Sequence, residues 1–187
     1  MKKIAGKKNE IIHEDWNRLT LIDGFQSFFN GIVAPFLTIY FNNFGGLEAV
    51  GISVAALYII KGLVSWGSSK VLNHRDMKKV FLFGQIFEGI RVVLFIFVQN
   101  IQGIIALQLI GGITGGLIVP AYNKLYVKVA SDEPDNAYRY KTAVTNFSIG
   151  SSAIIAGFLI NYLGYEIAFI AWGVTEIVYG IYFYFAV

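Results

Sequence analysis

The chain has 187 residues, of which 56% are hydrophobic and 14% charged, with a mean hydropathy of +0.59. A water-soluble domain of this size cannot bury so much apolar surface, so the composition predicts a membrane protein whose main partner is the lipid bilayer. The net charge of +3 does not indicate nucleic acid as a partner, because the basic residues form short clusters beside apolar runs rather than one soluble face. The chain has no cysteine and its two histidines lie far apart, so we expect no metal and no cofactor.

Residues 1–18 form a polar, basic N-terminal segment that we expect to be cytoplasmic. The apolar stretches that follow predict six transmembrane helices, each near the length that crosses a hydrocarbon core of about 30 Å. Because only helices satisfy their own backbone over such spans, we expect an all-α membrane bundle over residues 19–187. The predicted helices cover 19–41, 49–69, 80–98, 103–122, 142–163 and 167–187.

The distribution of charge predicts the topology of these helices. Every lysine and arginine falls in a predicted cytoplasmic segment except Lys61 and Arg91, which lie inside predicted helices. The segments 70–79 and 123–141 are basic loops, and none of the predicted outer turns carries a lysine or arginine. The positive-inside rule therefore predicts that both termini are cytoplasmic. We expect the protein to lie in the inner or plasma membrane of the cell.

Three sequence matches in the same order predict an internal repeat. Residues 31–35 resemble 116–120, residues 59–63 resemble 154–158, and the third and sixth helices each carry a glutamate, Glu88 and Glu176. We therefore expect residues 19–98 and 103–187 to be repeats of three helices. Because three is odd, the second copy enters from the opposite side and the repeat is inverted, as in many secondary transporters. A glycine and a proline four residues apart are expected to allow a kink and close packing in two of these helices: Gly31, Pro35, Gly116 and Pro120.

Two inverted three-helix units joined by a basic loop resemble the N-terminal half of a major facilitator superfamily transporter, closest in look to drug-efflux antiporters. The family motif Gly-x-x-x-Asp-Arg-x-Gly-Arg-Lys/Arg has a degenerate match at Ser69, Asn73, Arg75, Asp76, Lys78 and Lys79. Asn73 replaces the acid, which weakens its family role as a charged latch of the inward gate. Gln108 stands at the arginine position of the family pattern Arg-x-x-x-Gly, which argues against proton coupling through that residue.

The resemblance also implies a second half, because the family normally has twelve helices and its site lies between two six-helix halves. The chain is then either a fragment of a longer transporter or one copy in a parallel homodimer. We expect a secondary-active transporter of a small molecule, with efflux of an amphipathic compound as the leading interpretation and a proton as candidate co-substrate. The alternative is a non-transporting membrane scaffold or a subunit that binds a lipid or a peptide.

Five ionisable residues inside predicted spans are the candidates for transport or proton binding, together with Gln108: Asp23, Lys61, Glu88, Arg91 and Glu176. A charge in a span costs roughly 2.5–3.5 kcal/mol, so each needs a partner, a cavity or a function. Glu88 and Arg91 are three residues apart and are expected to pair, with Lys61 as a candidate third member. Three acids against two bases leave one carboxylate unpaired, which we assign to Asp23 or Glu176 as a proton site.

Small and aromatic residues give two further expectations. Two overlapping Gly-x-x-x-Gly pairs are expected to pack on the small face formed by Ser148, Ser152 and Ala156, and the family resemblance implies a sliding surface there: Gly111, Gly112, Gly115 and Gly116. Four phenylalanines of the first helix either line an apolar substrate cavity or face the lipid or core: Phe25, Phe28, Phe29 and Phe36. The sequence has no Ser/His/Asp set, phosphate loop, or haem or zinc spacing, so we do not expect an enzyme.

Overall fold

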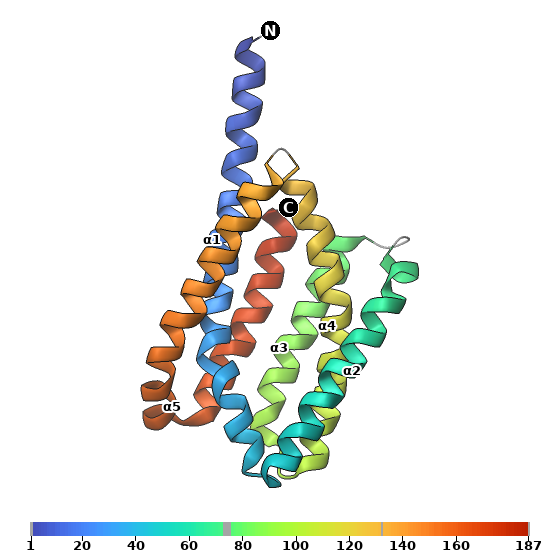
Figure 1. The fold of residues 1–187 in the computed structure, drawn as a ribbon, viewed down its shortest axis with the longest axis vertical. Helices are drawn as coiled ribbons and strands as arrows, with labels where there is room; N and C mark the ends of the chain where they lie inside the picture. Colours follow the sequence, from blue (N-terminus) through green and yellow to red (C-terminus); the bar gives the residue numbers. More distant parts are fainter. Residues whose placement is uncertain (1, 73–75, 132, 187) are drawn as a thin grey trace.

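The structure, a computed structural model, describes residues 2–72, 76–131 and 133–186. These residues form five α-helices and one short 3₁₀-helix, with no strand among them (Figure 1). The helices are α1 (Lys2–Asn42), α2 (Gly46–Leu72), α3 (Met77–Leu94), η1 (Phe95–Phe97), α4 (Ile101–Val129) and α5 (Pro134–Ala186). The all-helical prediction is confirmed for this part of the chain.

The last helix, α5, combines two helical segments. Gly164 inside it has φ 76° and ψ 172°, a left-handed conformation that side chains other than glycine rarely adopt. Figure 1 shows the chain reversing at this point, so that residues 134–163 and 165–186 run in opposite directions. The sequence predicts six separate helices, whereas the structure assigns five, because the turn at Gly164 is too tight to separate the last two.

The predicted cytoplasmic loop 123–141 is largely helical. The helix α4 continues to Val129 and α5 begins at Pro134, so only residues 130–133 lie between the helices. The hydroxyl of Tyr126 donates a hydrogen bond of 2.9 Å to the carbonyl oxygen of Ala137 and ties the two helix ends together. Charged residues such as Lys128 are good helix formers, so the polar sequence at this point does not end the helix.

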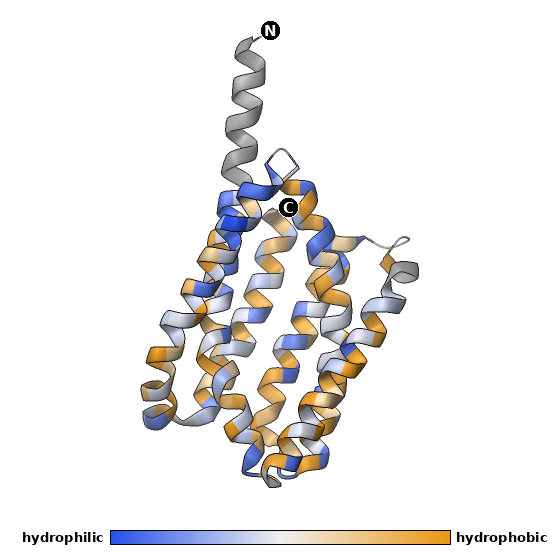
Figure 2. Ribbon diagram, viewed as in Figure 1, coloured by the Kyte–Doolittle hydropathy of each residue, from blue (hydrophilic) through white to orange (hydrophobic). Residues whose placement is uncertain are grey.

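Four of the described helices are long and apolar enough to cross a membrane, in the segments Gly46–Ser68, Met77–Phe97, Ile101–Val129 and Pro134–Ala186. The helix α1 is not among them, because its apolar stretch is interrupted by polar residues such as Asp23, Gln26 and Asn30. Figure 2 shows hydrophobic residues along most of the bundle and a band of hydrophilic residues at the end nearest the N-terminus. This pattern is typical of a multi-pass membrane protein.

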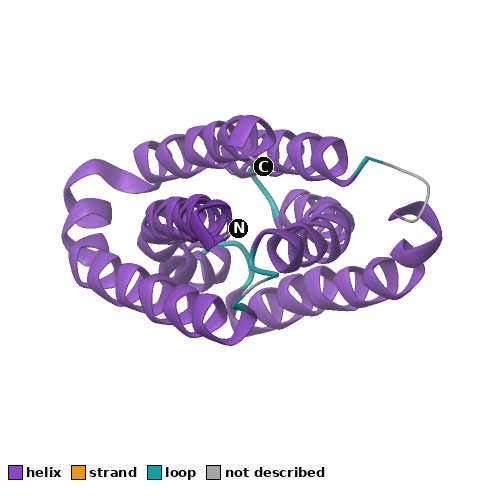
Figure 3. Cartoon of the chain, turned by 90° about the horizontal axis from the view of Figure 1, so that it is seen from above, coloured by secondary structure: helices purple, strands orange, loops and turns teal. Residues whose placement is uncertain are grey.

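Glycines allow three close contacts between helices that pack side by side in the bundle (Figure 3). A Cβ at Gly31 in α1 would lie 2.8 Å from the Cα of Ile149 in α5, so the two backbones nearly touch. A Cβ at Gly112 in α4 would lie 2.8 Å from the carbonyl oxygen of Leu57 in α2. Gly89 in α3 and Gly173 in the second segment of α5 make the third contact. A Cβ at Gly89 would lie 2.5 Å from the carbonyl oxygen of Gly173, and a Cβ at Gly173 would lie 2.6 Å from that of Gly89.

The predicted partner of the α4 glycines is wrong. Gly112 and Gly116 pack on α2, at Ile60 and Val64, and Gly111 packs on the guanidinium of Arg91. The small face of α5 packs instead on α1, where a Cβ at Gly31 would collide with the Oγ of Ser152. The close packing itself is confirmed. The sequence shows which helices have small faces, but it does not show which other helix each small face packs against.

Three of the four first-helix phenylalanines pack against the buried core, and the fourth is exposed. Phe28, Phe29 and Phe36 pack against a buried cluster around Phe41, Phe95 and Phe169, whereas Phe25 is exposed on the surface of the bundle. The exposed alternative and the core alternative are therefore both realised, and the polar cavity described next lies elsewhere.

Candidate functional site

A cavity of about 290 Å³ opens between the helices of the otherwise apolar bundle, and we call it the polar cavity because most of its lining residues are polar. Its walls come from α1, α3, α4 and both segments of α5, so distant parts of the sequence meet there. The polar lining residues are Asp23, Gln26, Ser27, Gln85, Tyr122, Asn123, Lys141, Thr145 and Tyr179, and the apolar ones are Phe81, Ile118 and Val119. A cavity that brings a carboxylate, an ammonium group and several amides together within lipid-facing helices is the candidate functional site.

Asp23 is held at this cavity by two tyrosines. Its side chain is only 4% exposed, and the hydroxyl of Tyr179 donates a hydrogen bond of 2.5 Å to Oδ1. The hydroxyl of Tyr122 donates a second hydrogen bond, to Oδ2. Both rings pack against Phe81, which fixes the position of the two hydroxyls. Two donors from different helices stabilise a carboxylate that would otherwise be costly to bury.

Lys141 supplies the positive charge of the cavity, and sequence reasoning missed it. Its Nζ lies 4.0 Å from the ring centroid of Tyr122 and 4.5 Å from that of Tyr126, which are cation–π distances. Its charge also acts on Asp23, with the Tyr122 ring in contact with both groups. The prediction treated residue 141 as the end of a loop. The signal that could have found it is Pro134, a favoured first residue of a helix, which places Lys141 two turns inside α5.

Glu88 and Arg91 form the predicted ion pair, so that part of the sequence prediction is confirmed. The Nε of Arg91 donates to Glu88 at 2.9 Å, and its Nη1 donates to Oε1 of Gln108 at 3.2 Å. The hydroxyl of Thr114 donates to Glu88 at 2.7 Å and completes the network. A side chain at Gly111 would collide with the guanidinium, which explains why a glycine stands opposite Arg91.

Lys61 does not join this network. It is half-buried on α2 and lies over Gly115, where a Cβ would meet its Cε at 3.4 Å, with its Nζ above the Tyr58 ring. Within the described part of the chain Lys61 forms no ion pair within 4.0 Å. The structure therefore separates Lys61 from Glu88 and Arg91, which the sequence placed at similar depth.

Glu176 lies next to the polar cavity, in the second segment of α5. Its side chain is 3% exposed, and Gln26 and Trp172 each donate a hydrogen bond of 2.7 Å to the same oxygen, Oε1. The other oxygen, Oε2, has no hydrogen-bond partner among the described residues. Because Gln26 also lines the cavity, it links Glu176 to the group that contains Asp23. Neither carboxylate has a basic group within 4.0 Å in residues 16–68, 76–131 and 133–186.

The gating-loop motif is described only in part. Asp76 caps α3 by accepting a hydrogen bond of 3.0 Å from the backbone N–H of Lys78, and Lys79 is exposed. The side chains of Ser69, Asn73 and Arg75 lie outside the described residues. No group of three or more histidine, aspartate or glutamate side chains that could hold a metal is found in the described ranges.

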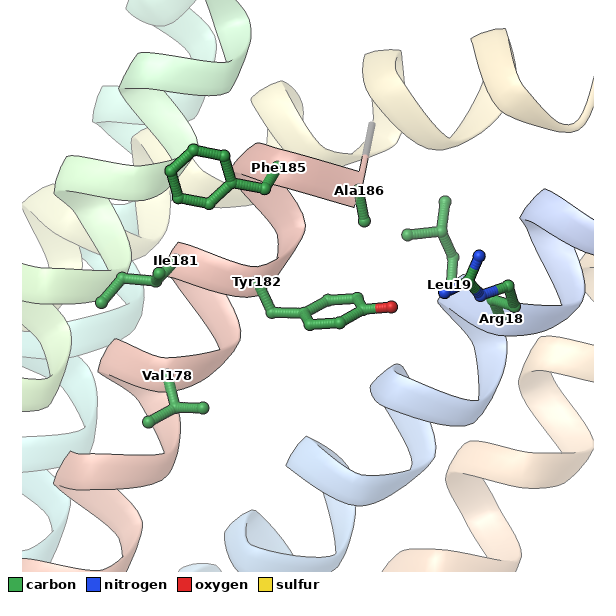
Figure 4. Close-up of a pocket in the computed structure, with 7 residues that line it drawn as sticks. All are labelled: Arg18, Leu19, Val178, Ile181, Tyr182, Phe185 and Ala186. Atoms are coloured by element: carbon green, nitrogen blue, oxygen red, sulfur yellow. The ribbon is translucent and has the colours of Figure 1, made fainter.

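Two larger cavities also open on the surface of the bundle, and most of their lining residues are apolar. One, of about 590 Å³, lies between α1 and the last turns of α5. Figure 4 shows the Tyr182 ring reaching from α5 toward Arg18 and Leu19 on α1. The other, of about 810 Å³, lies between α3 and α4, and its charged residues, Asp76 and Lys79, are at one end. Neither contains a buried charge, so the smaller polar cavity remains the candidate site.

An all-helical bundle in which four of the described helices are long and apolar enough to cross a membrane is typical of a multi-pass membrane protein. The family model described as Major Facilitator Superfamily matches residues 19–187, and the chain belongs to this superfamily of transporters. A comparison with curated proteins finds no match.

Proposed function

We propose that the chain is a six-helix half of a transporter and takes part in secondary-active transport of a small molecule, with efflux as its direction and a proton as co-substrate. The observation that carries the proposal is the polar cavity with two buried carboxylates, Asp23 in its wall and Glu176 beside it, neither of which has a basic group within 4.0 Å among the described residues. A buried carboxylate without a direct ion-pair partner is suited to bind and release a proton.

The glycine contacts support the inverted repeat. In the proposed repeat α1 corresponds to α4, and α2 corresponds to the first segment of α5. The contact of Gly31 in α1 with that segment then has a counterpart in the contact of Gly116 in α4 with α2. The contact between Gly89 and Gly173 pairs α3 with its own counterpart. A pattern of contacts that maps onto itself when the two halves are exchanged is what an inverted repeat predicts.

The Arg91 guanidinium beside Gln108 supports a structural role for the buried contact between α3 and α4. In the antiporters that the sequence resembles, an arginine at the position of Gln108 is tied to proton coupling. Here Arg91 supplies a guanidinium from α3 and donates to the Gln108 side chain at 3.2 Å. We propose that Arg91 and Glu88 hold this region of α3 and α4 together and that protons bind at Asp23 and Glu176 instead.

We place the second half of the transporter on α2 and the first segment of α5. Gly51 and Gly62 on α2 and Gly150 on α5 are exposed, and a Cβ at any of them would meet nothing within 4 Å. Exposed glycines in a membrane helix allow another helix to approach closely. The second bundle is either a continuation of the chain or a second copy in a parallel homodimer. Cysteines at positions 62 and 150 should cross-link to that bundle, whereas a cysteine at exposed Phe87 should not.

The membrane orientation and the gate are part of the same proposal. We place both termini, Lys78, Lys79 and Lys124 on the cytoplasmic side, with Asp76 and the two lysines at the inner gate and with Pro35 and Pro120 at the flexible points of α1 and α4. A membrane-impermeant thiol reagent should label single cysteines at positions 79 and 124 from one side only. Labelling of these two positions from opposite sides would overturn the orientation and the helix arrangement.

The test of proton coupling uses one neutralising change at each carboxylate. Asp23→Asn and Glu176→Gln should each reduce substrate-driven proton movement in proteoliposomes, read with an interior pH dye. Asp135→Asn is the matched control, because Asp135 is exposed at the start of α5. Full proton movement in both site variants would refute the proton role of these carboxylates.

A further inference from the structure

The polar cavity carries one negative and one positive side chain, and this balance indicates what it binds. Asp23 and Lys141 both line it, and they are not in direct ion-pair contact among the described residues. Tyr122 contacts both of them: its hydroxyl donates a hydrogen bond to Asp23, and the face of its ring contacts the Lys141 ammonium. The two charges are therefore held apart as separate poles of one small cavity.

The negative pole has hydrogen-bond acceptors that the protein leaves open. The carboxylate of Asp23 receives two tyrosine hydroxyls, whereas an ionised carboxylate has about four acceptor sites. Gln85, on α3, lines the same cavity, and its side chain is 5% exposed. Its carbonyl oxygen Oε1 is buried without a hydrogen-bond partner in the part of the chain that the structure describes. An ammonium group from a solute would satisfy both side chains.

The positive pole has donors that the protein leaves open. The ammonium of Lys141 lies against two aromatic faces, which attract its charge without using a hydrogen-bond acceptor atom. Thr145 is four residues further along α5, on the same face of the helix, and it lines the same cavity. Its hydroxyl is buried and has no partner among the residues described. A carboxylate from a solute would accept hydrogen bonds from both groups.

We propose that this cavity binds a small zwitterion, with the ammonium group of the solute at Asp23 and Gln85 and its carboxylate at Lys141 and Thr145. The inference deepens the proposed transport function by naming its substrate class, and it replaces the amphipathic compound expected from the sequence. The cavity volume of about 290 Å³ supports a solute smaller than a drug-sized ligand, for which pockets of about 300–1,000 Å³ are usual.

The nearest rival is a purely cationic solute, which the open oxygen of Glu176 would favour. Glu176 is not one of the residues that line the cavity, and both of its hydrogen bonds come from neighbouring side chains in the protein. A cation in the cavity would also lie beside the ammonium of Lys141. A solute with both charges avoids this repulsion and fills both poles.

The test compares matched solutes for binding to the purified full chain in nanodiscs of uncharged lipid, by isothermal titration calorimetry. The zwitterions are glycine, β-alanine and 4-aminobutanoate, which differ in charge separation, and the single-charge analogues are butylamine and butanoate. The best zwitterion should bind at least tenfold more tightly than either analogue. Equal or tighter binding of butylamine or butanoate, or no binding of any zwitterion, would overturn the inference.

Two variants test the two poles separately. Asp23→Asn should remove the preference for the ammonium group, so that butanoate binds as well as the zwitterion. Lys141→Gln should remove the preference for the carboxylate, so that butylamine binds as well. Thr145→Val should weaken the zwitterion and leave butylamine unchanged, which gives a third arm should one charge variant fail to fold. Lys128→Gln, at an exposed position of α4, is the control and should change nothing.

Binding and transport failures can be told apart. Zwitterion binding without flux in proteoliposomes would contradict the transport proposal and leave the inferred ligand class standing. Flux of an amphipathic dye without zwitterion binding would support transport and overturn this inference.

Discussion

The contact between Gly112 of α4 and α2 allows a quantitative prediction about packing. A Cβ added at Gly112 would lie 2.7 Å from the Cβ of Ile60 and 2.8 Å from the carbonyl oxygen of Leu57, whereas ordinary contacts are 3.4–4 Å. Because one neighbour is backbone, no change of side-chain rotamer can make room, and α2 must move away from α4. Overpacking of this kind costs about 1–3 kcal/mol.

The matched control for Gly112→Ala is Gly67→Ala. Gly67 is exposed on α2, where a Cβ meets nothing within 4 Å. Both changes gain the same helix propensity, about 0.8–1.0 kcal/mol, so their difference isolates the packing cost. We expect Gly112→Ala to lower the free energy of unfolding by about 1–3 kcal/mol relative to Gly67→Ala.

The measurement is equilibrium unfolding in mixed micelles with increasing sodium dodecyl sulfate, followed by tryptophan fluorescence. Trp172 is buried in the bundle and reports its opening. Equal stability of Gly112→Ala and Gly67→Ala would show that α2 and α4 do not approach as closely as described, and the packing argument would fail.

Three further predictions use the same unfolding assay. Arg91→Met should lower the free energy of unfolding by about 3–5 kcal/mol, because it leaves Glu88 buried without its partner. Adding Glu88→Gln should recover part of that loss, and no recovery would contradict a direct pairing. Tyr179→Phe should cost about 1–3 kcal/mol, because it removes a buried donor to Asp23, and an unchanged stability would argue against that hydrogen bond. Asn100→Ala should cost about 0.5–2 kcal/mol through loss of the α4 N-cap, whose side chain accepts a backbone hydrogen bond of 2.9 Å, and Asn100→Asp should restore it.

The features that could be predicted from the sequence depend on residues close together in the chain. Apolar runs of membrane-spanning length predicted an all-helical bundle, and the spacing of Glu88 and Arg91 predicted their ion pair, because three residues along a helix bring side chains to one face. Gly31 and Gly112 were expected at close helix contacts, because small residues favour them. Local geometry was sufficient in each case.

The composition of the candidate site could not be predicted in the same way. Asp23 was a candidate because a charge in an apolar run is visible in the sequence, whereas Tyr122, Tyr179 and Gln85 look like ordinary residues of a membrane helix. Their role depends on the meeting of four helices, and no local pattern encodes which helices meet. Lys141 was missed for a different reason, since a lysine near a helix end usually marks the membrane boundary.

The three glycine contacts have a consequence for how the protein is assembled. Each contact joins one helix from residues 2–97 with one from residues 101–186: Gly31 with α5, Leu57 with Gly112, and Gly89 with Gly173. The first three helices thus have their tightest neighbours in a region that the ribosome makes later. During synthesis these helices lie in the lipid, or beside the insertion machinery, before α4 and α5 have been made. A chain truncated after residue 98 should therefore be a target for membrane proteolysis.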